Sequence, residues 1–258
     1  MNDSAGQIPP EDEAVNFFRI LGDHTRLTLV RALAESDLRV GELVAHVALP
    51  QNAVSYHLKL LRGIGLLRDR RSSADSRDVY YSIDQERLEA LYRRAGTVLR
   101  PHSDIGITHE QSARSGNASL SILFLCTHNS ARSQFAEALA RREGGQRVTV
   151  VSAGDTPTGL HPLAAELLTE WNIDPAEYTS KAIAEFLGRS FDYVITVCDR
   201  VREHCPTFPG APRQLHWSIP DPTSAPEEKR REAFRSVRHE INVRVRHLLR
   251  ARPEYRAA

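Results

Sequence analysis

Hydrophobic residues in the first hundred positions recur mostly with the spacing of amphipathic helices. The clearest case is the segment 51–61, where Val54, Leu58 and Leu61 fall at i, i+4 and i+7 and should share one buried face. The pattern predicts four helices in succession: one from residue 13, a second after a boundary at 23–25, a short one over 40–47 and the helix over 51–61. Strands over 66–71 and 79–83 follow, and a last helix runs from 84 to about 99. The two strands, joined by a polar turn, should form a hairpin.

The first two helices carry more specific expectations. Four apolar residues should form the buried face of the first helix: Val15, Phe18, Ile20 and Leu21. Thr25 can cap the second helix, because a threonine side chain can accept a hydrogen bond from the first turn.

The second half of the chain alternates apolar strands with helices. The predicted strands cover 122–125, 148–152, 191–197 and 215–217, and the predicted helices cover 134–142, 162–171, 199–204 and 227–249. This alternation favours a parallel sheet with helices on both faces. Ligands of such sheets bind beyond the carboxyl ends of the strands. Cys126 and Cys198 each follow a predicted strand, so both should lie at that edge.

A chain of 258 residues favours two domains. Residues 1–12 are polar and expected to be loose, and the polar stretch 101–119 is typical of a linker, so the domains should span 13–100 and 120–258. The net charge of +1 does not indicate a partner. No apolar run approaches the roughly 20 residues that span a bilayer, and residues 1–10 lack the apolar core of a signal peptide. We therefore expect a cytoplasmic protein with no membrane association.

The stretch from Cys126 to Ser133 joins a predicted strand to a predicted helix. Such a loop directs backbone N–H groups at one point, and together with the helix dipole it can hold a tetrahedral oxyanion. Arg132 adds a planar, permanently charged group for the same anion, and this positive field favours the thiolate form of a cysteine. The candidate substrate-binding residues are Thr127, His128, Asn129, Ser130, Ala131, Arg132 and Ser133. The alternative is a buried, inert cysteine.

The pattern Cys-x5-Arg-Ser at Cys126 resembles the low-molecular-weight tyrosine phosphatases, whose fold is shared by one class of arsenate reductases. The other two cysteines, Cys198 and Cys205, are seven residues apart. On a regular helix this spacing corresponds to about 10 Å of rise, which is too far for a disulfide unless the segment unwinds. Two unrelated thiols or half of a zinc site remain alternatives. The odd number of cysteines argues against a structural disulfide framework.

The segment 196–206, taken with the loop, closely resembles the thioredoxin-coupled arsenate reductases. The resemblance implies a relay in which Cys126 attacks arsenate, Cys198 attacks Cys126 and releases arsenite, and Cys205 takes over the disulfide. Thioredoxin or another thiol reductant would then be the electron donor, and no cofactor is required. Asp221, followed by a proline, matches the acid that protonates the departing oxygen in this family.

Some relatives also bind potassium behind the loop. Four residues match that site, namely Asn129, Glu137, Ser152 and Thr179. Lys181 stands where the family pattern has an acid and can itself supply the positive charge, so no metal is predicted.

In the first half, the order of elements resembles the winged helix-turn-helix of the ArsR family of repressors. The resemblance is carried by Asp23–Leu27, Gly41–Leu43, Val54–Leu58, Gly65–Leu67 and Val79–Tyr81. It implies an α+β domain that binds operator DNA as a homodimer. Family members often sense arsenite or metals through cysteines in this region. None is present before Cys126, and His46 and His57 are not assigned as ligands, so the inducer stays open.

The candidate DNA-binding residues fall into two groups. Gln51, Asn52, Ser55 and Tyr56 are candidates for base edges, and Lys59, Arg70, Arg71 and Arg77 for phosphates. Between residues 59 and 71 five cations oppose only Asp69, an excess that suits phosphate contacts. The alternative is a solvated basic face.

Three functions follow from these patterns. The first is a bifunctional arsenic-resistance protein that reduces arsenate and represses transcription. The second is a tyrosine phosphatase fused to the same regulator. In those phosphatases tyrosines follow the Asp-Pro, whereas here Thr223 and Ser224 follow it, and the cysteine pair has no role in phosphate hydrolysis. The third is a regulator whose second domain only senses arsenic.

Overall fold

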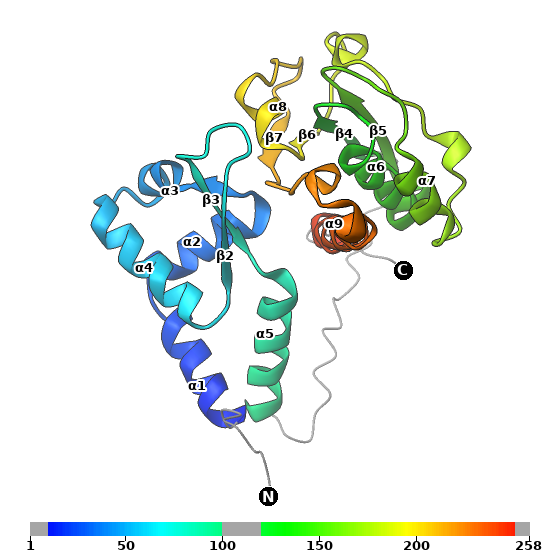
Figure 1. Cartoon of the computed structure of the whole chain (residues 1–258). Helices are drawn as coiled ribbons and strands as arrows, with labels where there is room; N and C mark the ends of the chain where they lie inside the picture. The colour runs from blue at the N-terminus through cyan, green and yellow to red at the C-terminus, as the bar shows by residue number, and fades with distance from the viewer. Residues whose placement is uncertain (1–9, 100–119, 251–258) are drawn as a thin grey trace, which may run out of the picture. The chain divides into compact units, whose positions relative to one another are not determined.

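A computed structural model describes residues 10–99 and 120–250, which divide into two compact units (Figure 1). The first unit is built on the elements from α1 to α5, and the second on those from β4 to α9. Residues 1–9 and the predicted linker lie outside the described residues. None of the helices in the described ranges is long and apolar enough to cross a membrane.

The first unit combines helices with a small sheet, as predicted. Its elements are α1 (Pro10–Leu21), α2 (His24–Glu35), β1 (Leu38–Arg39), α3 (Val40–Val47), α4 (Gln51–Gly63), β2 (Leu67–Arg71), β3 (Val79–Ile83) and α5 (Gln85–Leu99). The strands follow the order β1-β3-β2, so the predicted hairpin forms the larger part of the sheet. The short strand β1 was not predicted, and it pairs antiparallel with β3.

The predicted core of α4 is confirmed, because Val54, Leu58 and Leu61 are buried in the core of the first unit. The candidate DNA-binding side chains on α4 are all exposed, namely Gln51, Asn52, Ser55, Tyr56 and Lys59. The helix therefore presents one polar face to solvent and one apolar face to the domain.

Two expectations for the start of the chain are wrong. Helix α1 begins at Pro10, so residues 10–12 are helical rather than loose. The helix packs against α5 and buries Ala14 and Phe17, whereas Val15 and Phe18 are 64% and 45% exposed. The sequence offers two apolar rows on this helix, and packing against α5 selects the row that contains Ala14 and Phe17.

The predicted cap of α2 is also wrong. Asp23 occupies the N-cap position, and its Oδ1 accepts a hydrogen bond from the backbone N–H of Arg26 at 2.9 Å. Thr25 already lies inside the first turn of the helix. Aspartate is a strong N-cap residue, and the bond satisfies one of the otherwise unpaired donors of the first turn.

The second unit contains the predicted parallel sheet. Its elements are β4 (Leu120–Cys126), α6 (Arg132–Gly144), β5 (Val148–Gly154), α7 (Pro162–Thr169), β6 (Tyr193–Thr196), α8 (Asp199–Glu203), β7 (Arg213–His216) and α9 (Glu227–Arg250), with short 3-10 turns that include η4 (Pro222–Ser224). The strand order is β5-β4-β6-β7, and every neighbouring pair is parallel. Strand β4 is central, so its carboxyl end, Cys126, lies in the middle of the edge where ligands bind.

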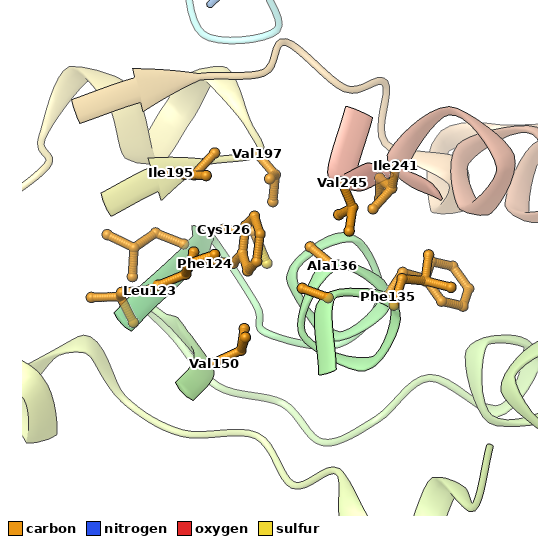
Figure 2. Close-up of a cluster of buried hydrophobic side chains, with 14 of the residues drawn as sticks. Leu123, Phe124, Cys126, Phe135, Ala136, Val150, Ile195, Val197, Ile241 and Val245 are labelled. Atoms are coloured by element: carbon orange, nitrogen blue, oxygen red, sulfur yellow. The ribbon is translucent and has the colours of Figure 1, made fainter. Parts of the chain in front are cut away.

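The core of the second unit lies between the sheet and α6 and α9. Figure 2 shows Phe124 of β4 with Phe135 of α6 and with Ile241 and Val245 of α9. Every residue of α6 from Arg132 to Ala140 is buried, because α9 covers the side of the helix that faces away from the sheet. Its polar side chains are therefore enclosed, and they hold the neighbouring loop in place.

Candidate active site

Cys126 ends β4, and the loop that follows leads into the first turn of α6. The thiol is buried, with its Sγ 2.9 Å from Ser133 Oγ. The backbone N–H of Asn129 points at the same sulfur over 3.1 Å. These contacts place hydrogen-bond donors around the sulfur, as a thiolate requires. The predicted loop is thus present as a strand-to-helix turn closed around Cys126.

Asn129 determines the shape of the loop. Its φ of 46° lies in the left-handed region, which asparagine tolerates better than most residues. Its side-chain amide donates to Ser133 Oγ at 2.9 Å and to Ser152 Oγ at 2.7 Å. A Cβ atom on Gly154 would lie 2.7 Å from the backbone nitrogen of Asn129, so only glycine lets the loop approach β5 this closely.

The segment after β5 runs beside the loop and pairs with its carbonyl groups. Backbone N–H groups of Thr156, Thr158 and His161 donate to the carbonyl oxygens of Thr127, His128 and Ser130, respectively. The loop carbonyls are therefore engaged by protein donors on one side. This arrangement suits an anion site, since carbonyl oxygens turned toward the anion would repel it.

Arg132 and Asp221 meet across the loop. Arg132 Nη2 lies 2.7 Å from Asp221 Oδ2, and its Nη1 donates to the carbonyl of Ile219 at 3.2 Å. Burial raises the pKa of Asp221, but the Arg132 charge and hydrogen bonds from Thr223 outweigh burial and hold that pKa below its ordinary value. The carboxylate therefore pairs with the guanidinium that an oxyanion in the loop would need.

The structure brings Cys198 to the loop and places Cys205 after the far end of α8. Cys198 is the N-cap of α8 and is buried, with its Sγ 3.4 Å from Thr127 Oγ1. Burial and the neighbouring Cys126 raise the pKa of the Cys198 thiol, while Arg132 opposes them. Cys205 follows α8 and is partly buried, and burial raises its pKa as well. All three cysteines are free thiols.

A buried cluster lies behind the loop. Glu137 Oε2 accepts from Ser152 Oγ at 2.6 Å and from Lys181 Nζ at 3.2 Å, and its Oε1 lies 2.5 Å from Arg141. Lys181 also donates to the carbonyl of Thr179 at 2.8 Å. The ammonium therefore contacts oxygen atoms of the residues that match the family's potassium site.

Two residues of this region were not singled out from the sequence. Gln134 Nε2 donates at 3.0 Å to the carbonyl oxygens of both Asn129 and Thr179. Ser180 Oγ donates to the same Asn129 carbonyl at 2.5 Å. Both side chains therefore fix the backbone of the loop at Asn129. The sequence does not indicate this role, since a glutamine inside a helix and a serine in a loop are usually exposed.

In the first unit, the candidate base-reading side chains on α4 are exposed, with Tyr56 at 60%. The predicted excess of positive charge is smaller than expected. Arg62 pairs with Asp69 at 2.6 Å, and Arg68 pairs with Asp84 at 2.5 Å, a carboxylate outside the stretch counted from the sequence.

The second unit matches the family model of the low molecular weight phosphotyrosine protein phosphatases over residues 121–255, and residues 23–69 match that of bacterial regulatory proteins of the arsR family. The chain is 38% identical over 127 residues to an arsenate reductase of Halalkalibacterium halodurans, covering 48% of this chain and 91% of that protein. An arsenate reductase of Bacillus licheniformis is 39% identical, with the same coverage.

About half of the chain also resembles solved structures. A thioredoxin-dependent arsenate reductase of Corynebacterium glutamicum is 31% identical with a TM-score of 0.42, covering 52% of this chain and 61% of that one. A low molecular weight protein tyrosine phosphatase of T. tengcongensis is 22% identical with a TM-score of 0.45, covering 52% of this chain and 100% of that one. The match of the family model over more than half of the chain shows that the chain belongs to the low molecular weight phosphotyrosine protein phosphatase family, and it carries an arsR-family helix-turn-helix domain ahead of that domain.

Proposed function

We propose that the protein reduces arsenate to arsenite through a three-cysteine relay and that its first domain binds operator DNA as a repressor. One observation carries the enzymatic part: a second buried thiol, Cys198, lies against Thr127 of the anion loop, 3.4 Å from its hydroxyl. Phosphate hydrolysis needs the loop cysteine, the arginine and an acid, and it has no use for this thiol. The similarity to proteins named arsenate reductase supports the same conclusion.

The first step is attack on arsenate. The oxyanion accepts hydrogen bonds from the loop N–H groups and from the guanidinium of Arg132. Its binding displaces Asp221 from the ion pair with Arg132. Beside a bound dianion and without the arginine, the pKa of Asp221 rises, so the carboxyl group can hold a proton. Cys126 forms a bond to arsenic, and one arsenate oxygen leaves as water with that proton. Arsenic keeps its +5 state.

The second step reduces arsenic. Cys198 attacks the sulfur of Cys126, the sulfur–sulfur bond forms, and the electron pair of the arsenic–sulfur bond goes to arsenic. Arsenic falls from +5 to +3 and leaves as arsenite, while two thiols become one disulfide. The charge of Cys126 is one cause of the raised pKa of Cys198, and it disappears when Cys126 bonds to arsenic. The attacking thiol is thereby easier to deprotonate at this stage than before.

The third step moves the disulfide. Cys205 attacks Cys198, Cys126 leaves as a thiolate, and the Cys198–Cys205 disulfide is reduced by thioredoxin or another dithiol. Helix α8 separates the two residues, so the segment must unwind for them to meet. The thioredoxin-dependent enzyme of Corynebacterium glutamicum supports this choice of reductant. A cytoplasmic location suits the relay, because thiols remain reduced there.

The DNA-binding part is supported by the arsR-family match and by the exposed polar face of α4. Homodimerisation through α1 and α5 is supported by three large exposed side chains, Val15, Phe18 and Tyr92, on these two neighbouring helices. A dimer places two recognition helices in successive major grooves, so the operator should be an imperfect inverted repeat.

The enzymatic proposal is tested with purified protein, arsenate, thioredoxin, thioredoxin reductase and NADPH, with arsenite as the measured product. Hydrolysis of para-nitrophenyl phosphate is measured in parallel. We expect sustained arsenite formation and weak aryl phosphatase activity, because Thr223 and Ser224 of η4 follow Asp221 and offer no aromatic clamp. Efficient aryl phosphate hydrolysis without arsenite would establish the phosphatase function instead. Cys198→Ser is the matched control, because it leaves the loop, Arg132 and Asp221 unchanged.

A further inference from the structure

A buried polar cluster holds the start of α8. Asp199, the first residue of the helix, accepts a hydrogen bond at its Oδ1 from Ser218 Oγ at 2.7 Å, and the same oxygen lies 3.1 Å from His216 Nε2. The other ring nitrogen of His216 is 2.9 Å from Thr196 Oγ1. The side chains of Asp199 and His216 are 0% and 3% exposed. A buried carboxylate is costly unless it is paired and hydrogen-bonded, so these contacts fix Asp199 firmly.

The cluster connects the segments that surround Cys198. Thr196 ends β6 two residues before Cys198, and Asp199 follows that cysteine directly. Ser218 precedes Asp221 by three residues on the segment whose Ile219 carbonyl accepts from Arg132. Both sides of Cys198 are therefore anchored to the segment that also holds the arginine and the candidate acid.

The other end of α8 leads into Cys205. Cys205 is only partly buried, and its Sγ contacts the carbonyl of the adjacent Pro206 at 3.7 Å. The backbone N–H groups of His204 and Cys205 make bonds of 3.2 and 3.4 Å back into the helix. The helix spans only Asp199–Glu203, so these two bonds close its last turn.

We infer that Asp199 and His216 are positioning residues that keep Cys198 at Cys126 while Cys205 moves. The inference rests on the proposed relay and assigns its mobile part. The thiolate of Cys205 attacks Cys198 Sγ, a new sulfur–sulfur bond forms, and the electron pair of the Cys126–Cys198 bond returns to Cys126. No net oxidation occurs in this step. Asp199 and His216 act through Cys198 and do not touch the reacting atoms.

The test separates the two disulfides. In a Cys205→Ser background, the rate of Cys126–Cys198 disulfide formation is measured by mass spectrometry, once after adding arsenate and once in an oxidised glutathione buffer. In a Cys126→Ser background, the rate of Cys198–Cys205 disulfide formation is measured in the same buffer. Asp199→Ala should slow the first disulfide by about tenfold or more, because misplacing a reacting group by about 1 Å is enough for such a loss. The same substitution should change the rate of Cys198–Cys205 disulfide formation by no more than about threefold, because that step depends on the movement of Cys205.

Matched variants distinguish positioning from general damage. Arg200→Ala changes the next residue of the same helix, whose side chain is exposed, and should behave like the unsubstituted protein. Asp199→Asn keeps the acceptor oxygen and should retain most of the rate. Hydrolysis of para-nitrophenyl phosphate, which needs no second cysteine, should be unchanged in Asp199→Ala and shows that the fold is intact. If Asp199→Ala does not fold, Ser218→Ala removes one donor only and should slow the same disulfide more mildly.

The inference would be overturned if Asp199→Ala slowed the formation of both disulfides equally, or if it left the rate of Cys126–Cys198 disulfide formation unchanged. The glutathione arm does not involve arsenate, so it stands independently of the proposed enzymatic function. If the unsubstituted protein forms no arsenite but Asp199→Ala still slows only the Cys126–Cys198 disulfide, the arsenate reductase function fails and the positioning role holds.

Discussion

The ammonium of Lys181 lies 3.2 Å from Oε2 of Glu137, a carboxylate whose side chain is only 1% exposed. The same ammonium donates to the carbonyl of Thr179 at 2.8 Å. Glu137 in turn accepts from Ser152, which holds the Asn129 side chain and hence the loop. The positive charge behind the loop is thus part of the chain itself.

Replacing this lysine should therefore create a requirement for potassium. Lys181→Ala leaves Glu137 with Arg141 as its remaining charged neighbour in the cluster and should lower the free energy of unfolding by about 1–2 kcal/mol. Potassium chloride should restore part of that stability in the variant and have no specific effect on the unsubstituted protein. Urea unfolding in potassium chloride or choline chloride measures this. Lys229→Ala, an exposed lysine on α9, is the control, and equal potassium effects on all three proteins would contradict the prediction.

The cysteines should have separable roles. Cys126→Ser should abolish arsenite formation, because no nucleophile remains in the loop. Cys205→Ser should form about one arsenite per protein and then stop, since no thiol remains to resolve the disulfide between Cys126 and Cys198. Mass spectrometry of alkylated peptides identifies the trapped disulfide. Continued turnover of Cys205→Ser with thioredoxin as sole reductant would rule out the relay.

The ion pair between Arg132 and Asp221 should contribute to stability in a pH-dependent way. Burial raises the pKa of Asp221, but Arg132 and Thr223 lower it by more, so the folded-state value lies below the unfolded value of about 3.9. The stabilisation is complete above the unfolded pKa and is lost as the pH falls through the folded pKa. Since the Asp221 side chain is 32% exposed, the contribution should not exceed about 1 kcal/mol.

Urea unfolding of Asp221→Asn and the unsubstituted protein between pH 6 and pH 2.5 measures this effect. Both tryptophans, Trp171 and Trp217, belong to the second domain, so their fluorescence reports that domain alone. The difference in the free energy of unfolding should be constant near neutral pH and shrink in acid. A difference that stays constant down to pH 2.5 would show that the ion pair does not stabilise the domain.

The extent to which the sequence predicted the site depends on how far apart the residues lie. Cys126 and Arg132 belong to one strand–turn–helix segment, so their spacing alone indicates an anion loop. Cys198 was placed at the same sheet edge because it follows a predicted strand, whereas the role of Cys198 and the choice of Asp221 came from family resemblance. The pair of Asp199 and His216 was missed, because an aspartate at the start of a helix is ordinarily an exposed residue and gives no sign of a histidine on a neighbouring strand.

The errors in the first domain have a similar cause. The apolar pattern of α1 contains Val15 and Phe18 as well as Ala14 and Phe17, and only packing against α5 decides which row is buried. The charge of Arg68 was counted as unopposed because Asp84 lies 16 residues further along the chain. Both errors concern contacts between elements, which local periodicity does not specify.

Substitutions on α4 should separate affinity from sequence preference. Lys59→Ala removes a candidate phosphate contact and should weaken binding to all sequences alike, with the salt slope reduced by about one unit. Gln51→Ala should instead relax preference at one base pair, with a cost of about 1–3 kcal/mol for the preferred sequence. Arg68→Ala is the control, because Asp84 already neutralises that arginine. Binding isotherms at several salt concentrations measure the slopes, and a sequence-dependent effect of Lys59→Ala would contradict its assignment.

The last prediction concerns induction by arsenite. The first domain contains no cysteine, so soft arsenic(III) has no thiolate ligand there. If arsenite releases the protein from operator DNA, the release should depend on Cys126, Cys198 and Cys205, the only thiols of the chain. The measurement is a DNA titration of the full-length protein and of a variant with all three cysteines replaced by serine, with and without arsenite. Both proteins should bind DNA equally well without arsenite, since the substitutions lie outside the helix-turn-helix domain. Release of the cysteine-free variant by arsenite would place the sensor in the first domain and refute the assignment to the second.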